Sequence, residues 1–356
     1  MLVSKYIVQF FKSKGIKKFF VFQGGAIMNI INEIGSDKSV KYLVPHHEQS
    51  LSMQVDTASR LQGYAVGLVT SGPGATNILT GVCSAYYDSI PCFFITGQVG
   101  QIHIKKNIKY RQLGFQETDV VSIFKNVTKY SKQIKNKKEI PTELEKAYQV
   151  SIAGRPGPVL LDIPFNIQGE EIKKIKKNLN YNLKNQSDHN KTKQQIIKYI
   201  KASTKILFII GGGIKNSTRK NQILNFLKKN KVPFALTWPS FEITDRNNKY
   251  YIGCIGKNGH RSANIACAEA DLIITLGQRF AVKNVFGSFG KKAKIIAIDI
   301  DKQETKSNLA NVNLGVNMSI DFFYEKILKN TAFIKNPNWT KEIFKIKKKF
   351  FDINVT

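Results

Sequence analysis

Short apolar runs alternate with helix-like stretches along the first half of the chain, and this alternation constrains its fold more than any other feature. The runs are continuously apolar, which is typical of strands buried on both faces of a parallel sheet. The expected strands are residues 18–23, 40–45, 64–70, 91–97 and 158–164, and the expected helices are 48–62, 75–87 and 140–153. Residues 1–165 therefore predict an α/β domain with a doubly wound parallel sheet.

A second series of the same kind follows a polar segment. Residues 166–192 are rich in Lys and Asn and predict a linker between domains. Strands are then expected at 205–213, 232–238, 270–277 and 294–301. Residues 193–330 therefore predict a second, Rossmann-like domain with its own doubly wound parallel sheet, and residues 331–356 the start of a connection to a further domain.

The chain is strongly basic, with a net charge of +30 over 356 residues. Seven of its 55 basic residues are Arg, and the Lys residues lie in scattered runs without a zinc-ligand spacing or an RNA-binding aromatic motif. We therefore expect a solvated, lysine-rich surface rather than specific nucleic-acid binding.

Cysteine usage and hydropathy indicate a cytoplasmic protein. The four cysteines form no CxxC pair, and most have apolar or small neighbours, as expected of reduced thiols. No run of 18 or more apolar residues is present, so no membrane span is expected. The N-terminal stretch has apolar residues at helical spacing, interrupted by Lys, which predicts an amphipathic helix rather than a signal peptide.

Polar or glycine-rich segments follow four strands of the first domain. They are residues 23–26, 46–49, 71–77 and 97–99. Because ligands bind beyond the carboxyl ends of the strands in an open parallel sheet, these segments are expected to line one cleft. The carboxyl group of Glu48 should then face this cleft, close to the glycine–proline turn around Pro73.

Five motifs stand in order along the first domain: PHHEQ, TSGPGATN, AYYDSIPCFFITGQV, YRQLGFQETD and AGRPGPVLLDIP. Together they resemble the thiamine-diphosphate enzymes of the acetolactate synthase type. The resemblance continues more loosely to about residue 325 through IIGGG, GCIGKNG, ADLIITLGQRF and IIAIDID. It implies that residues 1–165 are the pyrimidine-binding domain of that family and residues 193–330 its central domain.

The resemblance implies a catalytic role for Glu48, the family's acid that hydrogen-bonds the cofactor's aminopyrimidine ring and favours its imino tautomer. Such a carboxyl group must lie in a largely dry pocket, where water does not weaken its interaction with the ring. His47 is expected to orient the loop that carries Glu48. The other implied site residues of this domain are Phe115, Gln116 and Gly25 near the reacting carbon or substrate, and Gly24, Pro73, Asn77 and Gln98 around the cofactor.

In the central domain the resemblance implies the nucleotide pattern that holds FAD in acetolactate synthases. The residues concerned are Gly211, Gly212, Gly213, Gly277, Arg279 and Asp299, together with Arg155 of the first domain. The chain departs from the family here: GxRFDDR reads GQRFAVK, with Lys283 in place of the second arginine, and MHG reads KNG at residues 257–259. Two alternatives stay open, a retained FAD and a nucleotide fold kept for packing.

The family binds the diphosphate and Mg²⁺ through a GDG motif in a third domain, and GDG does not occur in this sequence. The chain is therefore expected to hold the pyrimidine half of the site, to contain no metal ligand of its own, and to be inactive alone. The missing diphosphate-binding domain would come from a longer reading frame or from a second polypeptide. Because the family builds each site between two subunits, a homodimer or tetramer is expected.

The expected activity is that of an acetolactate-synthase-like carboligase, a transferase or lyase. It would decarboxylate a 2-oxo acid such as pyruvate and transfer the acyl carbanion to a carbonyl acceptor, as in branched-chain amino-acid synthesis. One alternative is a related enzyme of surface-polysaccharide or nucleotide-sugar synthesis, which RQLGFQETDVVSIFK also resembles. A 2-oxo acid decarboxylase and a non-catalytic nucleotide-binding partner subunit are further alternatives.

Overall fold

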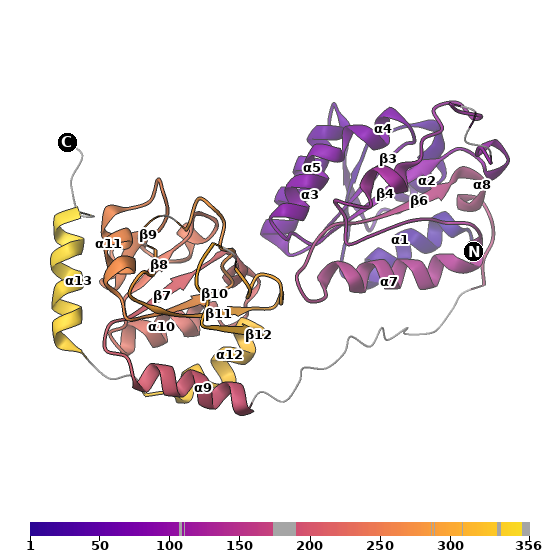
Figure 1. Ribbon diagram of the computed structural model, residues 1–356. Helices are drawn as coiled ribbons and strands as arrows, with labels where there is room; N and C mark the ends of the chain where they lie inside the picture. Colours follow the sequence, from indigo (N-terminus) through magenta and orange to yellow (C-terminus); the bar gives the residue numbers. More distant parts are fainter. Residues whose placement is uncertain are drawn as a thin grey trace. The chain divides into compact units, whose positions relative to one another are not determined.

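The computed structural model describes residues 1–106, 109, 111–173, 190–285, 287, 289–307, 309–332 and 336–350. The chain divides into two compact units, Met1–Lys184 and Asn185–Thr356, each with one parallel six-stranded sheet (Figure 1). The α/β class with two doubly wound sheets is thus confirmed. The middle of the expected linker, residues 174–189, lies outside the described residues, as do residues 351–356.

The first unit runs through the following elements: α1 Val3–Ser13, β1 Lys18–Val21, η1 Gly25–Ile27, α2 Met28–Ser36, β2 Lys41–Leu43, α3 Glu48–Gln62, β3 Ala65–Val69, α4 Pro73–Asn77, α5 Leu79–Tyr87, β4 Cys92–Gln98, η2 Gln101–His103, α6 Val120–Phe124, β5 Tyr130–Gln133, η3 Lys137–Glu139, α7 Ile140–Ile152, β6 Val159–Pro164 and α8 Phe165–Gln168. Its strand order is β2-β1-β3-β4-β6-β5, with every neighbouring pair parallel. The order reverses between β1 and β3, so the polar segments after these two strands meet at the point where such sheets bind ligands.

Helices cover both faces of this sheet (Figure 1). On one face α1, α2, α7 and α8 pack against Phe93 and Ile95 of β4, and on the other α3, α4, α5 and α6 pack against Cys92 and Phe94. Successive side chains of a strand point to opposite faces, so a strand between two helix layers is buried at every position, and any polar side chain on it needs a hydrogen-bond partner. All seven residues of β4 are buried, as this requires.

The second unit contains α9 Asn190–Lys201, β7 Ile206–Ile210, η4 Gly212–Asn216, α10 Lys220–Lys229, β8 Phe234–Leu236, η5 Trp238–Ile243, β9 Tyr251–Cys254, α11 Arg261–Glu269, β10 Leu272–Leu276, β11 Lys294–Asp299, β12 Leu314–Asn317, α12 Ile320–Lys326, η6 Leu328–Asn330 and α13 Pro337–Phe350. Its strand order is β12-β11-β10-β7-β8-β9, all parallel. Helices α9, α10 and α12 cover one face, and α11 and α13 the other. The order reverses between β7 and β10, the dinucleotide-binding position of a Rossmann sheet.

Several expectations for individual elements were wrong. The expected helix 75–87 is two helices, α4 and α5, which meet at Ile78. The run 40–45 was expected to be buried on both faces, but only Lys41–Leu43 forms a strand and all three residues are exposed, because β2 pairs with β1 alone at the sheet edge. Strands β5, β9 and β12 were not expected. None of the described helices is long and apolar enough to span a membrane.

Candidate active site

Glu48 is the first residue of α3, at the carboxyl edge of the first sheet. His47 precedes it as the N-cap, and its Nδ1 atom accepts a hydrogen bond from the backbone N–H of Gln49 at 3.1 Å. This bond satisfies one of the free N–H groups in the first turn of the helix. His47 therefore determines where α3 begins, and with it the position of Glu48.

The carboxyl group of Glu48 is buried, with the residue 8% exposed. Its Oε2 atom accepts a hydrogen bond from Asn77 Nδ2 at 2.9 Å, which brings the PHHEQ and TSGPGATN motifs together. Among the described residues Oε1 has no hydrogen-bond partner, and a Cβ atom built at Gly74 would lie 3.4 Å from it. One oxygen of a shielded carboxyl group thus remains available to a ligand, beside a glycine that leaves room for it.

Thr70, which directly follows β3, joins the segments after β1 and β3. Its Oγ1 atom accepts a hydrogen bond from the N–H of Ala26 at 3.3 Å. A Cβ atom at Gly24 would lie 2.4 Å from Thr70 Cβ, and one at Gly74 would lie 2.6 Å from Thr70 Cγ2. This role of Thr70 was not predicted, although its position between a strand and the glycine–proline turn is a usable signal in the sequence.

Gln116 lies against the glycine–proline turn. It adopts a left-handed backbone conformation with φ 59°, and a Cβ atom at Gly72 would lie 2.7 Å from both its Cβ and its carbonyl oxygen. Gly72 itself has φ 58° and precedes the exposed Pro73, the first residue of α4. Neighbouring Phe115 is 81% exposed. The structure thus brings Gln116, Pro73, Asn77 and Glu48 to one edge of the sheet.

The remaining first-unit residues differ in their surroundings. Gly25 begins η1 after β1, and the direction in which a Cβ atom would point is open. The side chain of Gln98 is buried, and its Nε2 atom donates to the carbonyl of Thr118 at 2.8 Å and to Asp162 Oδ2 at 3.0 Å. Those bonds occupy the amide within the protein, so its part in cofactor binding stays a prediction.

Asp162 of β6 is a fully buried carboxyl group that the sequence analysis did not single out. Besides Gln98, it accepts hydrogen bonds from Thr96 Oγ1 at 2.7 Å and from Gln133 Nε2 at 2.8 Å. Burial raises its pKa to about 6, and the three hydrogen bonds act in the opposite direction. The apolar sequence around it, PVLLDIP, gave no sign that its carboxyl group would join β4, β5 and β6.

Arg155 lies apart from Glu48. It is in the loop that leads into β6, at the amino edge of the sheet, and its Nε atom donates to Ser89 Oγ at 2.8 Å. Ser89 follows α5 at the same edge. Arg155 therefore takes no part in the cluster around Glu48.

In the second unit the predicted glycines meet between β7 and β10. A Cβ atom at Gly211 would lie 2.2 Å from the carbonyl oxygen of Gly277, and one at Gly213 would lie 2.9 Å from its Cα atom. The N–H of Gly213 also donates to that carbonyl at 3.0 Å. These glycines therefore let two backbone turns touch, whereas a Cβ atom at Gly212 would contact Pro239.

Gln278, directly after Gly277, is 2% exposed, and neither Oε1 nor Nε2 has a hydrogen-bond partner in the part of the chain that the structure describes. A buried amide without partners is unfavourable and calls for a water molecule or a ligand group. Exposed Arg279 follows it, and Asp299 ends β11, where its Oδ1 atom accepts from the N–H of Asp301 at 2.8 Å. This donor set fits a polar nucleotide at the crevice.

The two departures from the family pattern contact each other. The N–H of Lys257 donates to the carbonyl of Lys283 at 2.9 Å, and that carbonyl lies 2.6 Å from the place a Cβ atom would take on Gly256. The two segments that differ from the family pattern, one around Lys257 and one around Lys283, are therefore hydrogen-bonded to each other.

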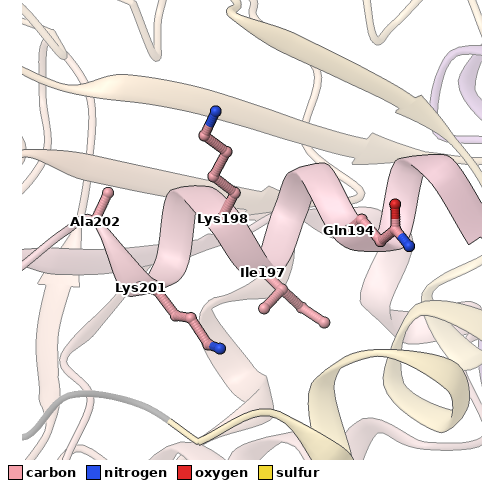
Figure 2. A pocket seen from close by; sticks show the side chains of 5 residues that line it. All are labelled: Gln194, Ile197, Lys198, Lys201 and Ala202. Atoms are coloured by element: carbon pink, nitrogen blue, oxygen red, sulfur yellow. The ribbon is translucent and has the colours of Figure 1, made fainter.

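A cavity of about 510 Å³ lies elsewhere, against α9. It is lined by Gln194, Ile197, Lys198, Lys201 and Ala202, and Figure 2 shows the two lysines leaving the helix in different directions. None of the candidate site residues named above is among the described residues that line this cavity.

Comparison with known families matches both units. Residues 1–123 match the thiamine pyrophosphate enzyme N-terminal TPP binding domain, and residues 193–325 match the thiamine pyrophosphate enzyme central domain. The chain belongs to the thiamine pyrophosphate enzymes, and it carries these two domains.

Three relatives of the chain are named acetolactate synthases. The chain is 30% identical over 353 residues to the acetolactate synthase large subunit of Lactococcus lactis, a match that covers 97% of this chain and 60% of that protein. It is 33% identical over 310 residues to the isozyme 2 large subunit of Escherichia coli, covering 85% and 54%. The chloroplastic enzyme of Arabidopsis thaliana is 30% identical over 312 residues, covering 85% and 45%. The chain thus spans about half the length of these relatives.

Proposed function

We propose that this chain supplies the aminopyrimidine-binding half of the active site in a thiamine-diphosphate-dependent carboligase of the acetolactate synthase type. One observation carries the proposal: a buried Glu48 carboxyl group is bonded to Asn77 beside the glycine–proline turn and keeps one oxygen free. Family membership and the acetolactate synthase relatives support it.

Thiamine diphosphate, when bound, would supply a thiazolium ring that has an acidic carbon and can accept the electron pair left when a 2-oxo acid loses CO₂. In this chain Glu48 would hold a proton at Oε1, opposite a ring nitrogen of the cofactor, while Asn77 keeps Oε2 occupied. Shielding from water strengthens the interaction of this carboxyl group with the ring. Pro73 and Gly24 would border the pyrimidine, and Gly25, Phe115 and Gln116 the substrate.

The substrate we propose is a 2-oxo acid such as pyruvate, whose acyl unit is joined to a carbonyl acceptor after loss of CO₂. Acetolactate formation for branched-chain amino-acid synthesis is the favoured case, because the relatives are acetolactate synthases. Magnesium and the diphosphate would be held by a further domain, supplied by the same polypeptide or a partner, in a cytoplasmic homodimer or tetramer. Magnesium binds phosphates together with carboxylate and carbonyl oxygens, which that domain would contribute.

The test is Glu48→Gln in the enzyme completed by its diphosphate-binding domain. Glutamine keeps the size of the side chain but cannot exchange a proton at the carboxyl position, so kcat should fall by about 10²- to 10⁴-fold. The measurement is CO₂ release from pyruvate under thiamine diphosphate saturation. Glu33→Gln on α2 is the matched control, since Glu33 lies outside the candidate site, and it should keep wild-type activity. Near-normal turnover of Glu48→Gln would overturn the proposal.

We further propose that the second unit binds FAD between β7 and β10. The proposal is supported by the position of Gly211, Gly212, Gly213, Gly277 and Arg279 directly after these two strands, of Asp299 at the end of β11, and of the buried, unpartnered Gln278 beside Gly277. The purified chain should then be yellow and release one flavin per chain on denaturation, measured by absorbance. A protein that is colourless after incubation with FAD and removal of the unbound FAD would contradict flavin binding. The nucleotide fold would then be retained for packing.

A further inference from the structure

The segment after β4 exposes large apolar side chains. Ile102, Leu113 and Phe115 all have more than half of their surface in contact with solvent. Exposed apolar side chains on an ordinary loop would be free to turn away from water, yet this segment is attached to the rest of the unit at several points. The attachments show which side chain determines the position of Phe115.

Glu117 makes the central attachment. It is only 7% exposed, although it lies in a connection between β4 and α6. Its Oε1 atom accepts a hydrogen bond from the N–H of Lys105 at 2.8 Å, and its Oε2 atom accepts one from the N–H of Leu113 at 2.7 Å. Both carboxylate oxygens thus bind backbone, and together they join two points that are eight residues apart in the sequence. Hydrogen bonds to a charged acceptor are among the stronger ones in proteins.

The turn that Glu117 closes carries Phe115 and Gln116. The N–H of Glu117 donates to the carbonyl of Gly114 at 3.1 Å, and Gln116 takes its left-handed conformation inside this turn. A Cβ atom at Gly114 would lie 2.9 Å from His103 Cβ, so the turn also packs closely against η2. Gln116 of the same turn packs against Gly72.

These contacts form one connected path. Glu117 binds the N–H of Leu113, the turn from Gly114 onward places Gln116 against Gly72, and Gly72 is the N-cap of α4. Asn77, the last residue of α4, donates to Glu48. A left-handed non-glycine residue such as Gln116 is unfavourable and persists only where its surroundings hold it.

We infer that Glu117 is a positioning residue that holds Phe115 and Gln116 at the substrate side of the site, without touching the reacting atoms itself. The inference rests on the proposed function, because it assigns these two residues to the substrate. Loss of either hydrogen bond would let the Gly114–Glu117 turn relax, and the exposed Phe115 ring would then leave its position.

The experiment replaces Glu117 with Gln, which keeps the shape but retains only one acceptor oxygen. In the 356-residue chain, amide hydrogen exchange at Lys105 or Leu113 should speed up by about tenfold or more, while core strands such as β4 keep their protection. In the completed enzyme, kcat/KM for the 2-oxo acid should fall by about 10- to 100-fold. The thiamine diphosphate concentration needed for half activation should stay as in the wild type.

Asp119→Asn is the matched control. Asp119 lies two residues further on, and its carboxylate accepts from the N–H of Ser122 at 3.1 Å as the cap of α6, away from Lys105 and Leu113. It should show wild-type exchange at both amides and wild-type kcat/KM. Unchanged exchange in Glu117→Gln would refute the attachment, and faster exchange with unchanged kcat/KM would refute the positioning role. Because Glu48→Gln tests the function separately, failure of one inference is distinguishable from failure of the other.

Discussion

Glu48 on α3 and Asp162 on β6 are two buried carboxyl groups of the first unit with different surroundings. Glu48 has one oxygen bonded to Asn77 and the other open beside Gly74. Asp162 is enclosed among Thr96, Gln98 and Gln133, with no exposed surface. The first arrangement leaves a group for a ligand, and the second joins three strands.

The raised pKa of Asp162 should make the free energy of unfolding depend on pH. Burial raises its pKa to about 6 in the folded chain from the ordinary value of 3.8, so between these values the folded state binds a proton that the unfolded state does not. Stability from this group is therefore greatest below about pH 4 and is lost as pH rises through about 6. The free energy of unfolding of the wild type, minus that of Asp162→Asn, should fall by about 2 kcal/mol between about pH 4.5 and pH 6.5.

Urea unfolding of both proteins at several pH values measures this difference. The subtraction removes the contributions of all other titrating groups, which the two proteins share. A difference that stays constant across this range would show that the folded and unfolded pKa values of Asp162 are alike.

At the scale of elements, the central strands were predictable and the edge strands were not. β3, β4 and β6 lie between two helix layers, so most of their residues are apolar and the run is visible in the sequence, although buried Gln98 and Asp162 interrupt it. β5 reads YSKQ and is only half-buried, because it pairs on one side with β6. An edge strand needs no continuous apolar run, so its sequence resembles that of a loop.

Helix α13 belongs to the second unit, although its lysine-rich sequence was expected to begin a connection. Trp339 is 3% exposed, lies in the core layer with α11, and donates from Nε1 to the carbonyl of Ile206 at 3.1 Å. Its neighbour Asn336 caps the helix by accepting from the N–H groups of Asn338 and Trp339 at 3.1 Å. In the sequence of α13 a few apolar residues stand among many lysines, so its packing against the core was not predicted.

Trp339→Ala should therefore destabilise the second unit by about 3–5 kcal/mol, since it removes a large buried ring and leaves a cavity. The matched control is Trp238→Ala, at the other tryptophan of the chain, which is 61% exposed and should change stability by less than about 0.5 kcal/mol. Thermal unfolding by calorimetry measures both, with the transition of the first unit as an internal reference. Equal effects of the two substitutions would mean that α13 does not contribute to the core.

Across the whole molecule, the two units share a parallel six-stranded sheet but differ in strand order. In the first, the strand order reverses between β1 and β3, where Gly24 and Thr70 touch. In the second, it reverses between β7 and β10, where Gly211 and Gly277 touch. Gly24 leaves room for the side chain of Thr70, whereas Gly211 lets its backbone reach the backbone of Gly277.

The α/β class, the two sheets and the family were predictable from the residues alone, since the buried strands are mostly apolar and the motifs after them keep their order. Glu48 and the glycine–proline turn were predictable in the same way. Which side chains meet became visible in the folded chain: Asn77 with Glu48, Gln116 with Gly72, Glu117 with the N–H groups of Lys105 and Leu113, and Asp162 with three strands. Hydrogen bonds between residues distant in sequence depend on strand order and register, and no local pattern of residues encodes those distances.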